Sequence, residues 1–239
     1  MSDLSPDMRL GTPDRPAPRP APALLDSVGR IEPVRTRRPL LTLALVAIAT
    51  AAYPLYVLSQ FPLRKDLPGL PVLWFVGIAL LWLAGFVLPL TLALLPARGR
   101  VLPNEGWAGR AALAAAVLLT VASLFTIDAP GQTILWAPGW DAFVRSMRGC
   151  FLFGLRIVIP AVVLGTIALA RVMLVGAARL GAAIGAAGGA LSGLTLHALC
   201  PVGGAFHVVT SHAGVVVAGA VLGAVVFPLV RRVVSALSS

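Results

Sequence analysis

The residues of this chain that are best suited to chemistry are gathered in one short segment, residues 197–212. The segment contains all three histidines and one of the two cysteines, as His197, Cys200, His207 and His212. Cysteine and histidine are ligands for zinc, copper and haem iron, although the pattern H-x2-C-x6-H-x4-H matches no common zinc-finger spacing. We therefore treat these four residues as candidate metal ligands. The alternative is that the histidines only form hydrogen bonds at a membrane edge.

The second cysteine, Cys150, opens one apolar segment, and Cys200 closes the next. Antiparallel helices joined by a short loop are usually neighbours, so we expect the two thiols at similar depth. Three interpretations stay open: a structural or switchable disulfide, a metal or cofactor site shared with the histidines, or two thiols that are merely buried. A disulfide requires the two Cα atoms to lie within about 7 Å of each other.

Arg156 lies six residues after Cys150, inside the same apolar segment. A charge at that depth is costly and often marks a partner or a function. Alternatively, the side chain extends to the interface and keeps its guanidinium in water. The apolar segments contain no Asp or Glu, which argues against a cation-coupled transporter. The chain also lacks a Ser/His/Asp set, paired carboxylates, a Walker loop and HExxH, so we expect no enzymatic activity.

The composition indicates a membrane protein, because 58% of the 239 residues are hydrophobic and only 12% are charged. Soluble domains are about 25% charged. Six apolar segments approach or reach the ~20 residues that span a bilayer, and none alternates as a membrane β-strand does. The sequence therefore predicts an all-α bundle of six membrane helices. The predicted spans are about 40–61, 71–96, 108–127, 150–170, 180–199 and 212–230.

Glycines recur at every fourth position before the histidine-containing segment, at Gly181, Gly185, Gly189 and Gly193, and the next step of the series is His197. A four-residue step keeps one face of a helix. Small residues on such a face allow the backbone of another helix to approach closely in a bilayer. We therefore expect this helix to place His197 on a packed face at its end.

The basic residues next to the spans predict the orientation of the chain, because Lys and Arg accumulate on the cytoplasmic side. They fall into a set of ten on one side and a set of four on the other. The ten are Arg35, Arg37, Arg38, Arg98, Arg100, Arg110, Arg171, Arg179, Arg231 and Arg232; the four are Arg64, Lys65, Arg145 and Arg148. This bias accounts for the net charge of +10 and places both termini in the cytoplasm.

We divide the chain into an N-terminal tail, residues 1–38, and a membrane domain, residues 39–239. Residues 1–22 are rich in Pro, Asp and Arg, which predicts disorder, as a spacer or as a polyproline ligand. Residues 23–31 predict a short amphipathic helix whose apolar face carries Leu24, Leu25, Val28 and Ile31. Such a helix docks into a groove of a partner protein or lies on the lipid surface.

Three stretches together resemble the NrsF-type membrane anti-sigma factors (negative regulators of sigma F), which combine a short cytosolic N-terminus with six spans. The first stretch comprises Leu24-Leu25-Asp26-Ser27-Val28, then Pro33-Val34-Arg35 and Arg37-Arg38-Pro39. The second is Cys150 followed by an apolar helix with Pro160. The third is the Gly/Ala-rich helix that ends in Leu196-His197 and Cys200-Pro201, although the family usually has His directly before Cys-Pro.

The resemblance implies a regulator in the bacterial inner (cytoplasmic) membrane that sequesters an extracytoplasmic-function (ECF) sigma factor with its tail. The implied partner-binding residues are Leu24, Leu25, Asp26, Val28, Ile31, Val34 and Arg35. It also implies that the membrane domain senses stress through Cys150 and Cys200, with His197 and Arg156 as further candidates. The competing hypothesis is a metal- or haem-binding membrane protein or enzyme that uses the same cysteine and histidines.

Overall fold

The computed structural model describes residues 38–96, 103–127, 140–169 and 176–238. The chain separates into two units, Met1–Arg37 and Arg38–Ser239, and all the described helices belong to the second unit. The predicted tail helix and all the residues predicted to bind a partner lie outside the described residues.

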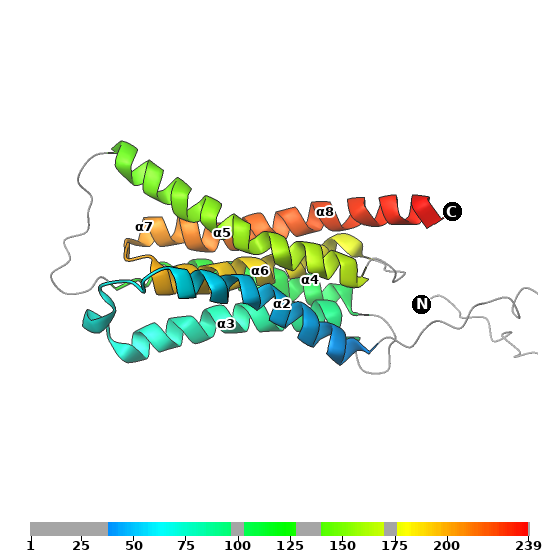
Figure 1. Cartoon of the computed structure of the whole chain (residues 1–239), viewed down its shortest axis with the longest axis horizontal. Coiled ribbons are helices and arrows are strands. Elements are labelled where there is room, and N and C mark those ends of the chain that lie inside the picture. The colour runs from blue at the N-terminus through cyan, green and yellow to red at the C-terminus, as the bar shows by residue number, and fades with distance from the viewer. Residues whose placement is uncertain (1–37, 97–102, 128–139, 170–175, 239) are drawn as a thin grey trace, which may run out of the picture. The chain divides into compact units, whose positions relative to one another are not determined.

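The second unit consists of long helices (Figure 1). The first four are α2 (Pro39–Gln60), α3 (Val72–Leu94), α4 (Glu105–Ala122) and α5 (Trp140–Leu169), with a short 3₁₀ turn, η1 (Leu67–Gly69), before α3. They are followed by α6 (Ala177–Leu199) and then by one continuous helical rod, which comprises α7 (Ala205–His207), the π-helical η2 (Val208–Ala213) and α8 (Gly214–Ser238).

Six of these helical segments are long and apolar enough to cross a membrane. Among the described residues the only β-type pairing is an isolated bridge between Pro96 and Pro103. The prediction of an all-α bundle with six membrane helices is therefore confirmed. Large apolar side chains are exposed on the outer surface, for example Ile48, Leu73 and Ile167, which is compatible with a multi-pass membrane protein.

Two helices begin at least seven residues earlier than the sequence predicts, whereas α4 and α6 begin only three residues earlier. The fourth was expected to start at about residue 150, but α5 starts at Trp140. The sixth was expected at about 212, but its helical rod starts at Ala205. In both cases the added turns contain polar residues. These residues lower the mean hydropathy of the segment, so the apolar pattern begins later than the helix, but they do not prevent helical hydrogen bonding. The first turns of α5 splay away from the neighbouring helices (Figure 1).

Helix α6 lies at the centre of the unit and contacts α2, α3, α4, α5 and α8. Its predicted glycine face is confirmed. A Cβ atom added at Gly181 or Gly185 would collide with the backbone of α8, at Gly223 and Gly219 respectively. A Cβ added at Gly193 would instead meet the ring of Trp82 on α3. The face therefore packs against α8 along most of its length and against α3 near its end.

Substitution of Gly185 should test how much the unit depends on this close approach. We expect Gly185→Ala to lower the free energy of unfolding by about 2 kcal/mol or more, because overpacking at a backbone contact displaces whole helices. The measurement is unfolding of the detergent-solubilised protein by SDS, monitored by circular dichroism. Gly77→Ala on α3 is the matched control, since no atom lies within 4 Å of its added Cβ. Equal stability of the two variants would contradict the close α6–α8 packing.

Candidate thiol and histidine site

Two cysteines and two histidines meet at the end of the bundle where α2 and α6 end and α3 and α5 begin. We name Cys150, Cys200, His207 and His212 the Cys/His cluster. The Sγ atoms of Cys150 and Cys200 lie 3.7 Å apart, and both cysteines are free. The Sγ of Cys200 also lies 3.5 Å from Nε2 of His207. The expectation that the two thiols lie at similar depth is confirmed.

A short π-helical segment gives His207 and His212 their common orientation. Residues five apart in an α-helix diverge by about 140° around the axis. In a π-helix the hydrogen bonds run from i to i+5, so residues five apart lie about one turn apart. Segment η2 begins directly after His207 and includes His212. The two rings meet edge to face with centroids 5.7 Å apart. Single π-turns of this kind are frequent at functional sites.

Contacts with α5 hold this irregular segment in place. The hydroxyl of Ser211 donates to the backbone oxygen of Met147 at 3.3 Å. The hydroxyl of Thr210 lies 3.1 Å from the sulfur of Met147 and donates to the backbone oxygen of Phe206 at 2.7 Å. Since Met147 lies three residues before Cys150 on α5, these bonds fix η2 to the helix that carries the first thiol.

Cys200 follows α6 in the turn before α7, outside the spanning segments, and its surroundings favour the thiolate. The thiol of Cys150 contributes most, and the imidazoles of His207 and His212 contribute further, so together they lower the pKa of Cys200 although burial opposes them. A thiolate is both the nucleophilic form of cysteine and the form that binds metal. The site therefore fits thiol oxidation as well as metal coordination.

The separations within the cluster resemble the edges of a tetrahedral metal site. With sulfur at about 2.3 Å and nitrogen at about 2.05 Å from zinc, two sulfurs lie about 3.8 Å apart and a sulfur and a nitrogen about 3.6 Å apart. The observed distances are 3.7 Å and 3.5 Å. The ligand atoms of Cys150, Cys200 and His207 all lie within 4.8 Å of one another. These three residues are therefore close enough to hold a metal ion.

His212 is buried and interacts with Cys200, but it does not belong to the group of ligand atoms that all lie within 4.8 Å of one another. Its Nε2 atom and Nδ1 of His207 are buried and have no hydrogen-bond partner among the described residues. Metal-bound histidines usually donate their second N–H to an outer partner. The structure shows no such partner for His207 in the part of the chain that it describes.

His197 lies outside this group of ligand atoms. Its Nε2 lies 3.2 Å from the backbone oxygen of Phe75, and its ring stacks on the ring of Phe75 with centroids 4.5 Å apart. Trp74 contacts the same ring at 5.5 Å. His197 therefore occupies the packed face that the glycine series predicted, where it connects the end of α6 to the beginning of α3.

A buried ion pair completes this end of the bundle, and sequence reasoning missed it. The guanidinium of Arg64 binds both carboxylate oxygens of Asp66, at 2.7 Å and 2.5 Å, and this contact lowers the pKa of Asp66. The backbone N–H of Arg64 donates to the backbone oxygen of Ala198 at 3.0 Å. Its side-chain Nη1 donates to the backbone oxygen of His197 at 3.4 Å. The pair thus satisfies terminal carbonyls of α6. The sequence did contain a signal for this ion pair, because Arg64 and Asp66 are opposite charges two residues apart in an otherwise largely apolar loop.

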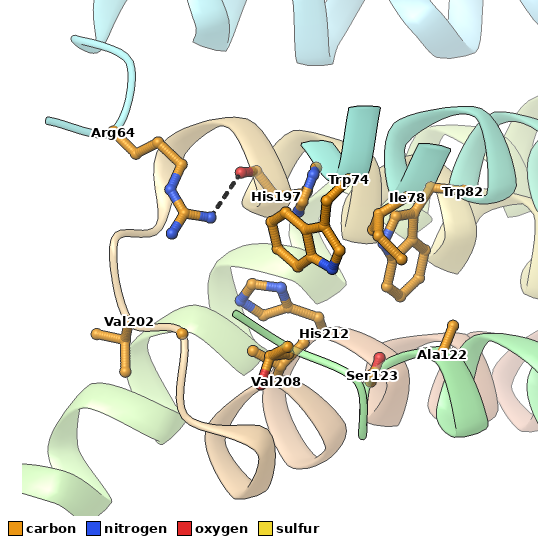
Figure 2. Close-up of a pocket in the computed structure, with 12 residues that line it drawn as sticks. Arg64, Trp74, Ile78, Trp82, Ala122, Ser123, His197, Val202, Val208 and His212 are labelled. Atoms are coloured by element: carbon orange, nitrogen blue, oxygen red, sulfur yellow. Dashed lines mark hydrogen bonds between the residues drawn. The ribbon is translucent and has the colours of Figure 1, made fainter. Parts of the chain in front are cut away.

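Two hollows adjoin the cluster. A small, partly enclosed cavity of about 20 Å³ is lined by residues that include Arg64, Trp74, His197 and His212, drawn in Figure 2, and this volume suffices for one water molecule. On the other side is an open groove of about 480 Å³, lined by residues that include Cys150 and Cys200. We call the second hollow the thiol groove. Its open shape leaves space beside the two cysteines.

Arg156 takes no part in the cluster. Its side chain is exposed on α5, and no hydrogen bond or ion pair involving it is found within the described ranges of the chain. Of the two interpretations of Arg156, this exposure favours the one in which the side chain extends to the interface.

Comparison with known proteins identifies no relative. No protein-family model, curated protein or solved structure matches the chain at a significant level. The assignment of a function therefore depends on the chemistry of the chain's own residues.

Proposed function

We propose that this chain is a membrane-bound anti-sigma factor, which sequesters an ECF sigma factor with its tail and releases it when the cysteine pair changes state. The observation that supports the sensory part is the contact of Cys150 and Cys200 at 3.7 Å, although fifty residues separate them in sequence. The tail part rests on the apolar face of residues 23–31 and on the resemblance of Leu24-Leu25-Asp26-Ser27-Val28 to the family's N-terminal helix.

The position of the thiols suits a switch. Cys150 belongs to α5, and Cys200 directly follows α6, which contacts five other membrane helices. A disulfide that closes a loop of fifty residues contributes about 4 kcal/mol in the chain-entropy model. Each 1.4 kcal/mol corresponds to a tenfold change in an equilibrium. Oxidation of the pair can therefore shift the equilibrium between the folded bundle and the unfolded chain by about a thousandfold, and it selects the packings of α5 and α6 in which the two sulfurs can bond.

A second candidate function is metal binding, favoured by the near-tetrahedral separations among Cys150, Cys200 and His207. Thiolate and imidazole ligands suit zinc and copper, and also haem iron. Here Cys150 and Cys200 would hold the metal by sulfur, His207 by Nε2, and His212 would supply a fourth ligand. The metal would supply a structural or sensory link between α5, the end of α6 and η2.

The proposed orientation places both termini in the cytoplasm of a bacterium and the Cys/His cluster near the outer face of its inner membrane. It rests on the ten-to-four bias of basic residues, and the beginning of α2 and the end of α8 do lie at the same end of the unit (Figure 1). We expect a reporter enzyme that works only in the cytosol to be active when fused to either terminus. Activity only in reporters that require export would reverse the orientation.

The tail should bind the sigma factor through its apolar face. Burial of one Leu contributes roughly 1.5–3 kcal/mol, so Leu25→Asp in the full-length protein should weaken binding at least tenfold. The measurement is titration of the detergent-solubilised chain with the sigma factor encoded nearest to its gene. Leu10→Asp is the matched control, because the same change falls outside the predicted helix. No binding of any sigma factor by the wild-type chain would falsify the anti-sigma function.

The two cysteines should act as one unit in signalling. We expect Cys150→Ser and Cys200→Ser each to change sigma-dependent reporter expression in the same direction. The double variant should equal either single variant, because each change removes the same pair. Ser146→Ala is the control, since Ser146 lines the same groove without a thiol. Wild-type signalling by the double variant would leave the cysteines with a packing role only.

The metal hypothesis predicts one bound ion for each chain. Purified protein equilibrated with Zn²⁺ should retain one equivalent after desalting, measured by mass spectrometry of the native protein. Loss of one ligand in Cys200→Ser or His207→Ala should weaken binding at least tenfold. His197→Ala should leave it unchanged, because Nε2 of His197 lies 3.2 Å from the backbone oxygen of Phe75. Unchanged retention in Cys200→Ser would contradict the proposed ligand set.

A further inference from the structure

We propose that the thiol groove binds the ring of a lipid-soluble quinone, which oxidises Cys150 and Cys200 to a disulfide. This inference rests on the proposed thiol switch, for which it names the oxidant. Three features support it: the size and lining of the groove, its position beside lipid-facing side chains, and the electron balance of the reaction.

The groove has the dimensions and lining of a site for a small apolar molecule. Its volume of about 480 Å³ falls within the range of about 300–1,000 Å³ that is usual for ligand pockets. Among the described residues that line it, the only polar side chains are Ser146 and the two cysteines, and none is charged. A charged, water-soluble oxidant finds no complementary group among these residues. An uncharged ring finds apolar walls with two sulfurs among them.

Two aromatic side chains line the groove and contact each other. Phe61 follows the end of α2, and Phe153 lies on α5 one turn after Cys150. Their rings meet edge to face with centroids 6.4 Å apart. Flat rings pack favourably against aromatic side chains in stacked or edge-to-face arrangements. The two phenyl groups thus form a wall that suits a planar ring next to the sulfur of Cys150.

The groove adjoins the part of the surface that faces lipid. Phe61, which lines the groove, is 54% exposed, and Leu152 on α5 is 45% exposed. A molecule dissolved in the bilayer therefore meets apolar side chains along its path between α2 and α5. Cys200, in contrast, is only 7% exposed. Access to its sulfur therefore depends on the groove.

The reaction balances with a quinone as the only added reactant. Two S–H bonds break and one S–S bond forms, which releases two electrons and two protons. The quinone accepts both electrons and both protons and leaves as the hydroquinone, with two new O–H bonds. The sulfurs approach each other from 3.7 Å to about 2.05 Å, the length of a disulfide bond.

The test uses the full-length, reduced protein in lipid nanodiscs without oxygen, with decylubiquinone as the probe. We expect one quinone to be reduced per chain while two thiols are lost, monitored by quinone absorbance and by thiol alkylation. Gly149→Phe should slow this oxidation at least tenfold, because Gly149 lines the groove and no atom lies within 4 Å of its added Cβ. Gly149→Ala should cause a smaller decrease, since it fills less of the groove.

Gly77→Phe is the matched control and should react at the wild-type rate, because Gly77 is equally open but lies on α3. Diamide, a small water-soluble thiol oxidant, should form the disulfide in every variant and so show that the pair remains intact. Oxidation by diamide but not by the quinone would overturn the inference, and so would a wild-type rate in Gly149→Phe. Quinone oxidation without release of a sigma factor would overturn only the anti-sigma function.

Discussion

The close contact between the backbones of α6 and α8 is the constraint on which the rest of the structure depends. Gly181 and Gly185 allow carbonyl groups of α8 to approach where a methyl group would collide. The chain therefore turns back at Cys200 and returns directly along α6. That return path places His207 and His212 beside the thiol that ends α6. A wider helix pair would separate the histidines from Cys200, and the cluster would not form.

The same end of the bundle combines fixed and unpaired polar groups. The ion pair of Arg64 and Asp66 is fully hydrogen-bonded, and the Nε2 of His197 contacts the backbone oxygen of Phe75. Because the pKa of Asp66 is lowered, the ion pair stabilises the fold at neutral pH, and this contribution is lost as the pH falls through that lowered value. Nδ1 of His207 and Nε2 of His212, in contrast, are buried without a partner in the described part of the chain. The reactive cluster thus rests on a rigid support.

Periodicity and composition were enough to predict six helices, the glycine face of α6 and the shared depth of Cys150 and Cys200. The sequence also placed His212 among the candidate ligands, but it did not predict the π-helical segment that orients this residue, because one inserted residue per turn leaves no mark on hydropathy. For His197 the sequence left two roles open, a metal ligand and a residue on a packed face. The glycine series predicted the packed face, and the contacts with Phe75 decide for it. The Arg64–Asp66 ion pair could not be predicted, because it lies in a loop whose conformation does not follow from sequence periodicity.

The geometry of the resting cluster distinguishes the two proposed chemistries of the site. Metal binding requires the sulfurs about 3.8 Å apart, which the structure already provides at 3.7 Å. A disulfide requires them about 1.7 Å closer. A ligand shifts a conformational equilibrium only if it binds one state more tightly than the other. A metal bound in the cluster would therefore stabilise the arrangement in which the sulfurs are separated, whereas oxidation would stabilise the one in which they are bonded. Since both proposed reactions use the same sulfurs, a bound metal would also protect the pair from an oxidant.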